Sequence, residues 1–121
     1  MTGCEEHALD SSTLAHEVID ALVDRQAADV VLLDLRTLGR FTDYFVIASS
    51  GGERQLRALV EAVDAAVGPH GLHPRWEGRN EDGWRLADLG GTVVHLFTVE
   101  QRARYDLEGL WLRAREIVRI Q

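Results

Sequence analysis

Residues 84–97, with the sequence WRLADLGGTVVHLF, decide the fold. Two runs of strand-forming residues flank Gly90 and Gly91, and glycine supplies the positive φ that a tight hairpin turn requires. With Gly90-Gly91 as the turn, Leu89 faces Thr92, and the register of the two strands follows. The aliphatic face of this hairpin then suits packing on helices and carries Arg85, Ala87, Leu89, Val94 and Leu96. The aromatic face pairs Trp84 with Phe97, Leu86 with His95, and Asp88 with Val93, and it could meet a partner.

Before the hairpin the sequence predicts two helices and three strands. The first helix is capped by Ser11, Ser12 or Thr13 and runs to about Ala28, with an apolar face formed by Leu14, Val18, Ile19 and Leu22. Short apolar runs predict buried strands at residues 30–33 and 43–48, and the second ends at Ser49-Ser50-Gly51-Gly52. A second helix follows and stops at Gly68-Pro69, with an apolar face formed by Leu56, Leu59, Val60, Val63 and Val67. A strand near residues 72–77 completes a strand–helix–strand order, so we expect an α/β fold: a single domain with a mixed β-sheet flanked by helices.

After the hairpin the sequence predicts a helix from about Val99. Its apolar stripe consists of Ala103, Leu107, Leu110 and Ala114, whereas Tyr105 lies off this stripe and is expected to be exposed. Asp106 and Gly109 leave open whether this stretch is one helix or two. Residues 116–121 fit either a helix end or an added strand.

Composition and charge limit the partners of the chain. Its 121 residues fit one domain, expected at residues 11–121 after a flexible leader of residues 1–10. The net charge is −7 and all 13 basic residues are arginine, so nucleic acid is not expected as the main partner, whereas a basic protein surface is compatible. No apolar run approaches the roughly 20 residues that cross a bilayer. The single cysteine, Cys4, fits a reducing compartment, and we therefore expect a cytoplasmic protein without membrane interaction.

Motifs for catalysis or for metal binding are weak. The turn Ser49-Ser50-Gly51-Gly52 stands where phosphate-binding loops stand, but it lacks their spacing and the chain has no lysine, so a plain strand-to-helix turn is favoured. His70 and His73 lack two further ligands and are expected to be polar loop residues. Asp88 and His95 share a hairpin face without a nucleophile beside them, which favours a hydrogen-bonded structural or interface pair. We therefore expect no catalytic residue, no cofactor and no metal.

Aromatic residues gather in the last third of the chain. Trp84, Phe97, Tyr105 and Trp111 alternate with arginines and acidic residues, and aromatics with arginine anchor protein interfaces. The alternative, that these are core aromatics, is equally compatible with the sequence.

Three blocks of residues resemble the ribosomal silencing factor (Iojap) family. The first is Thr42-Asp43-Tyr44-Phe45-Val46-Ile47-Ala48-Ser49, followed at family spacing by Arg54-Gln55. The second is Glu77-Gly78. The third is long and specific, and contains Trp84, Asp88, Gly90, Val94-His95-Leu96-Phe97, Arg102, Tyr105, Leu107-Glu108 and Leu110-Trp111. The chain departs from the family pattern at Ser50, Gly52 and Gly91, which alters the chemistry of two turns and leaves the third block otherwise intact.

The resemblance implies a fold shaped like nucleotidyltransferases but without their catalytic carboxylates. It also implies a protein that is not an enzyme, forms a homodimer when free, binds the large ribosomal subunit through the fourteenth protein of that subunit, and blocks joining of the small subunit. The residues expected to contact the partner are Trp84, Asp88, His95, Phe97, Arg102, Tyr105, Leu107, Glu108 and Trp111. The alternatives are an assembly adaptor for the large subunit or a nucleotide-binding enzyme.

Overall fold

A computed structural model describes residues 11–36, 42–105 and 115–120 of the chain. They form one six-stranded sheet in the order β3-β4-β5-β2-β1-β6. The strands are β1 (Ala28–Asp34), β2 (Tyr44–Ser50), β3 (Trp76–Glu77), β4 (Trp84–Asp88), β5 (Thr92–Thr98) and β6 (Arg115–Ile120). The helices are α2 (Ser11–Asp24), α3 (Glu53–Val67) and α4 (Val99–Tyr105), with short 3-10 turns at Gly68–His70 and Asn80–Asp82. β2 and β5 are parallel and the other pairs are antiparallel, so the predicted mixed α/β sheet is confirmed.

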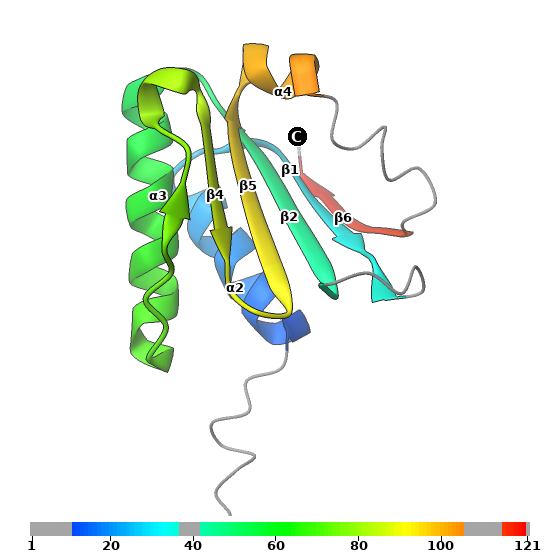
Figure 1. Cartoon of the computed structure of the whole chain (residues 1–121). Coiled ribbons are helices and arrows are strands. Elements are labelled where there is room, and N and C mark those ends of the chain that lie inside the picture. The colour runs from blue at the N-terminus through cyan, green and yellow to red at the C-terminus, as the bar shows by residue number, and fades with distance from the viewer. Residues whose placement is uncertain (1–10, 37–41, 106–114, 121) are drawn as a thin grey trace, which may run out of the picture.

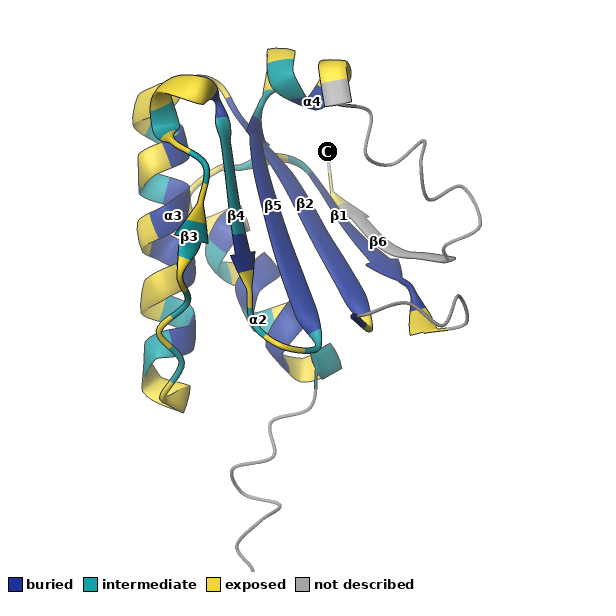
Figure 2. Cartoon of the chain, in the orientation of Figure 1, coloured by how far each residue is buried: buried dark blue, intermediate teal, exposed yellow. Residues whose placement is uncertain are grey.

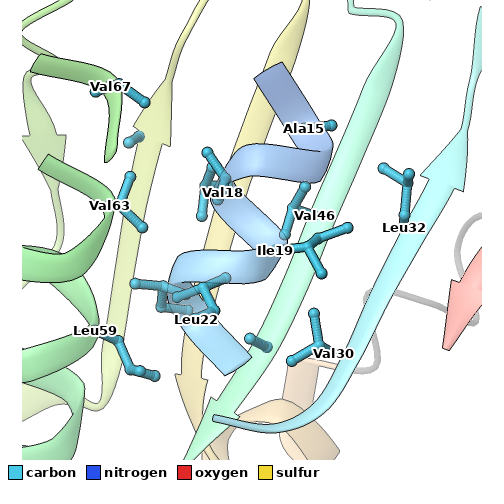
Figure 3. Close-up of a cluster of buried hydrophobic side chains, with 14 of the residues drawn as sticks. Ala15, Val18, Ile19, Leu22, Val30, Leu32, Val46, Leu59, Val63 and Val67 are labelled. Carbon is cyan, nitrogen blue, oxygen red and sulfur yellow. The ribbon is translucent and has the colours of Figure 1, made fainter. Parts of the chain in front are cut away.

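The two long helices lie side by side on one face of the sheet, and α4 lies at the end of β5 (Figure 1). All apolar positions predicted for α2 and α3 are buried. Figure 3 shows side chains of α2, among them Val18, Ile19 and Leu22, directed between α3 and the strands. Removal of this apolar surface from water supplies most of the driving force for folding, at roughly 25 cal/mol per Å².

Helix α2 ends at Asp24, four residues before the expected position. The N–H of Ala27 donates to the carbonyl of Leu22 (3.0 Å) and that of Gln26 donates to Val23 (2.9 Å). Gln26 has a φ of 64°, so this is the Schellman arrangement that closes helices with a left-handed residue. The helix therefore stops early because the chain turns at Gln26, and Ala28 already belongs to β1.

The hairpin has the predicted register. Trp84 pairs with Phe97, Leu86 with His95, and Asp88 with Val93. The N–H of Leu89 donates to the carbonyl of Thr92 across the turn (2.8 Å), and Gly90 adopts a φ of +97°. Ala87, Val94 and Leu96 of the aliphatic face join the core beneath α2 and α3, as expected.

The strand expected at residues 72–77 is shorter than the sequence predicted. It comprises only Trp76–Glu77 and pairs antiparallel with β4 at the sheet edge, partly because Pro74 cannot donate to a ladder. The parallel neighbour of β2 is β5, so the crossover passes through α3, β3 and β4. β2 itself continues through Ser50, where the sequence predicted a break from Ser49.

The C-terminal stretch ends as a strand. β6 pairs antiparallel with β1, which decides between the two alternatives for residues 116–121. In α4 the expected inward position, Ala103, is exposed, and Arg102 is buried instead. The predicted stripe residues Leu107, Leu110 and Ala114 lie outside the described residues, as does the expected leader of residues 1–10 with Cys4.

Candidate partner-binding surface

The face of the sheet opposite α2 and α3 carries a second apolar cluster. Its buried members alternate along the strands with residues of the first core, as the period of two in a strand requires. The cluster consists of Val31, Leu33, Leu35, Phe45, Ile47, Val93 and Phe97, with Trp84 and Leu86 packed partly buried against it. The aromatic hairpin face is therefore part of this packed cluster.

His95 is enclosed in this cluster and is only 7% exposed. Its ring lies 4.6 Å from the Phe45 ring, edge to face, and 6.2 Å from the Phe97 ring in a nearly parallel arrangement. Burial lowers the pKa of His95 from 6.5 to about 4, and Nε2 has no hydrogen-bond partner in the described part of the chain. The imidazole of His95 is therefore neutral near pH 7 and packs between the two aromatic rings like an apolar side chain.

The expected hydrogen-bonded pair between Asp88 and His95 is wrong. Asp88 is exposed, and its Oδ1 accepts a hydrogen bond from the N–H of Gly90 at 2.9 Å. The register explains this, because Asp88 faces Val93 while His95 faces Leu86. One carboxylate oxygen of Asp88 thus stabilises the hairpin turn through this hydrogen bond.

Trp84 is half-buried and lies against a glycine. Gly78 has a φ of +84°, and a Cβ atom there would lie 2.5 Å from Cε3 of Trp84 and also against the Trp84 carbonyl oxygen. Only glycine leaves room for the indole at this place. The sequence predicted no structural role for Gly78, and its place in the Glu77-Gly78 block is the signal that could have found it.

The accessible part of the aromatic face follows β4. Trp84 and Leu86 are half-buried and Asp88 is exposed, at the period of two that places them on one face. Figure 2 shows β4 less buried than the neighbouring β5, which is dark blue along most of its length. We call Trp84, Leu86 and Asp88 the β4 stripe. Phe97 and His95, also expected as contact residues, support the stripe from within the domain.

Arg102 lies inside the domain, where its guanidinium has internal acceptors. Nη1 donates to the carbonyl of Asp29 (2.5 Å) and to Oγ of Ser49 (2.9 Å), and Nη2 lies 3.7 Å from a carboxylate oxygen of Asp29. The sequence missed Asp29 and Ser49 as partners, because they are 73 and 53 positions away. Of the other expected contact residues, Tyr105 ends α4 but its side chain is not described, and Leu107, Glu108 and Trp111 lie outside the described residues.

The turn at residues 49–52 is a structural strand-to-helix connection. The N–H of Gly51 donates to Oε1 of Gln55 (2.6 Å), and Oγ of Ser50 donates to the carbonyl of Gly52 (3.1 Å). A cavity of about 420 Å³ beside the turn is lined by four carboxylates, those of Glu53, Glu81, Asp82 and Glu100. Since carboxylates repel phosphate, this place is unsuited to the anion that the alternative reading required.

The loop histidines give no sign of metal binding. Nε2 of His70 lies 2.7 Å from Oε1 of Glu17. Among the residues that the structure describes, no three His, Cys, Asp or Glu side chains gather closely enough to hold an ion. None of the described helices is long and apolar enough to cross a membrane.

These features define a small α/β protein with an accessible stripe on a hairpin and a packed apolar cluster beside it on the same face. Residues 8–121 match the profile of the family described as "Ribosomal silencing factor during starvation" (RsfS). The chain belongs to this ribosomal silencing factor family.

Individual relatives agree with that assignment. A ribosomal silencing factor of Halalkalibacterium halodurans is 32% identical over 85% of this chain and 89% of its own length. A mouse protein named "Mitochondrial assembly of ribosomal large subunit protein 1" is 32% identical over 78% of this chain and 43% of its own length. A crystal structure of a Chromobacterium violaceum protein superposes with a TM-score of 0.80 at 29% identity, covering 85% of this chain and 87% of the other.

Proposed function

We propose that the protein binds the large ribosomal subunit through the fourteenth protein of that subunit and sterically blocks joining of the small subunit, thereby repressing translation in the cytoplasm. The observation that carries the proposal is the β4 stripe, which exposes an indole and a carboxylate on one face of a strand. The family assignment supplies the ribosome as the class of partner.

The packed cluster beside the stripe favours binding. Because its cross-strand neighbours Phe97, His95 and Val93 are buried beside it on the same face, the stripe has little side-chain or strand freedom to lose. Trp84 is held in one place by Gly78 and can serve as the apolar anchor, the type of residue that dominates interface energies.

The charge of the protein fits a basic partner. The net charge is −7, and Asp88 is exposed at the end of the stripe. A rim carboxylate of this kind steers association and contributes modestly to affinity. We propose that Tyr105, Leu107, Glu108 and Trp111 complete the surface.

The test is co-sedimentation of Trp84→Ala with isolated large subunits. We expect its affinity to fall at least about thirtyfold, the equivalent of about 2 kcal/mol for a lost aromatic anchor. The matched control is Trp76→Ala. The Trp76 indole is also half-buried, but it packs on the helix side and donates to Asp64 (2.9 Å). Trp76→Ala should lose stability and keep its affinity when folded; equal affinity of both variants and the wild type would remove the stripe from the binding surface.

The blocking step needs its own measurement. Wild-type protein added to separated subunits should reduce the formation of joined ribosomes, and it should sediment with free large subunits and not with intact ribosomes. Normal joining at saturating protein would contradict the steric mechanism. We also propose a homodimer in the free state, which light scattering would detect as a mass twice that of the chain.

A second candidate is an assembly adaptor for the large subunit, favoured by the name of the mouse relative. The two functions differ in the particle bound. An adaptor would be enriched on immature particles, whereas the silencing factor that we propose is expected on mature large subunits.

A further inference from the structure

Arg102 is buried although it belongs to a helix of only seven residues. Its side chain is 9% exposed, while its neighbours Ala103 and Arg104 face solvent. The guanidinium joins three elements, since it reaches from α4 to Asp29 in β1 and to Ser49 near the end of β2. A buried charge that loses such partners is costly, so these bonds hold α4 against the sheet.

The acceptor in β1 is presented by a bulge. Ala28 pairs with Ser49 and Val31 with Ile47, so Asp29 and Val30 together oppose the single residue between Ser49 and Ile47. Asp29 has a φ of 51°, the left-handed conformation that marks the first residue of a glycine-type bulge and that aspartate tolerates better than most residues. The bulge releases Asp29 from the regular ladder, and Arg102 binds its carbonyl oxygen there.

The turn before this bulge is also held from α3. Nε2 of Gln55 donates to the carbonyls of Arg25 (3.2 Å) and Gln26 (2.8 Å). The turn before β1 is thus held from α3, and the bulge within β1 is held from α4. Arg102 links this bulge directly to α4.

We propose that Arg102 is a positioning residue for partner binding and not itself a contact residue. By tying α4 to the bulge at Asp29 and to Ser49, it fixes Tyr105, the last residue of α4, relative to the β4 stripe. This inference rests on the proposed function. When two parts of a binding surface already have a fixed relative position, binding to a rigid partner costs less conformational entropy.

The first arm of the test is hydrogen exchange in the free protein. In Arg102→Ala the amides of Ala103, Arg104 and Tyr105 should exchange at least about tenfold faster, because the local opening of α4 no longer breaks bonds to a charged group. The amides of the hairpin should keep their rates. Arg102→Lys should give intermediate rates, since an ammonium cannot reproduce the fork of donors of a guanidinium.

The second arm uses a residue that cannot touch a partner. Ser49 is 3% exposed, so Ser49→Ala can alter binding only by removing an acceptor of Arg102. We expect affinity for isolated large subunits to fall about tenfold or more in Arg102→Ala and about threefold in Ser49→Ala, with little further loss in the double variant. Ser50→Ala is the matched control, because this buried serine donates to Gly52 and should be replaceable without loss of affinity.

The outcomes separate the proposals. Loss of binding in Arg102→Ala with wild-type binding in Ser49→Ala, or unchanged exchange in α4, would make Arg102 a contact residue and overturn the inference while the proposed function stands. Weak binding of the Arg102 and Ser49 variants with normal binding of Trp84→Ala would overturn the inference as stated, because the β4 stripe would then be no part of the binding surface. Absence of wild-type binding to large subunits would remove the proposed function, and the role of Arg102 in it.

Discussion

Replacement of His95 by leucine should remove a large part of the acid sensitivity of the fold. The imidazole lies between Phe45 and Phe97, and its Nε2 has no hydrogen-bond partner among the described residues. Leucine has a similar volume and no polar atom, so His95→Leu should be neutral or mildly stabilising near pH 7.

The magnitude follows from the pKa of His95, which burial lowers from 6.5 to about 4. As the pH falls below 6.5 the unfolded chain takes up a proton at this position, whereas the folded chain does so only near pH 4. The unfolded state is therefore favoured progressively through this window, and the stability is fully present above it. Each pKa unit corresponds to about 1.4 kcal/mol, so His95 accounts for about 3 kcal/mol of stability lost between pH 6.5 and 4.

The assay is urea unfolding at several pH values between 7 and 4. The difference between the wild type and His95→Leu should grow by about 3 kcal/mol on acidification, because all other groups titrate in both proteins. His73, exposed in a loop, gives the control His73→Leu, which should keep the wild-type pH dependence. Parallel pH profiles for the wild type and His95→Leu, or an NMR titration of His95 near 6.5, would refute the reasoning.

Two further substitutions test the backbone. Gly78→Ala should cost about 1–3 kcal/mol and displace Trp84, because its Cβ would lie 2.5 Å from Cε3 of the indole; denaturant unfolding and subunit co-sedimentation measure the two effects. Gly90→Ala is the control, because Gly90 also has a positive φ but an added Cβ there would meet open space. It should lower stability without weakening subunit binding. Equal loss of binding in both variants would contradict the idea that Gly78→Ala acts on binding by displacing Trp84. Gln26→Gly should raise the free energy of unfolding by up to about 1 kcal/mol, since φ at Gln26 is 64° and glycine adopts this conformation freely; a lower melting temperature would contradict the role of Gln26 in closing α2.

The hairpin was predictable because its turn is local. Gly90, with its positive φ, allows the tight turn, the turn fixes the register, and the register fixes which side chains share a face. The apolar stripes of α2 and α3 were predictable for the same reason, since a helical period needs only neighbouring residues. All these features are determined within about 15 residues of chain.

Features that depend on distant segments were missed. The parallel neighbour of β2 is β5, and the sequence predicted no partner for β2 because the pairing depends on how α3, β3 and β4 pack. The internal acceptors of Arg102, Asp29 and Ser49, were missed because they are far away in the sequence. The bulge that presents Asp29 has no local signal, since the left-handed residue is not a glycine.

The position of a strand in the sheet explains why the predicted contact face divides into two parts. β5 lies between β4 and β2, so its side chains His95 and Phe97 are covered by neighbours on both sides. β4 has only the two-residue strand β3 beyond it, so Trp84 and Leu86 on the same face remain partly open. The alternation of side chains along a strand decides which face of the sheet a residue lies on, and the position of the strand in the sheet decides how exposed that residue is. A substitution in β5 should therefore act on binding through stability, whereas one in β4 can act on binding directly.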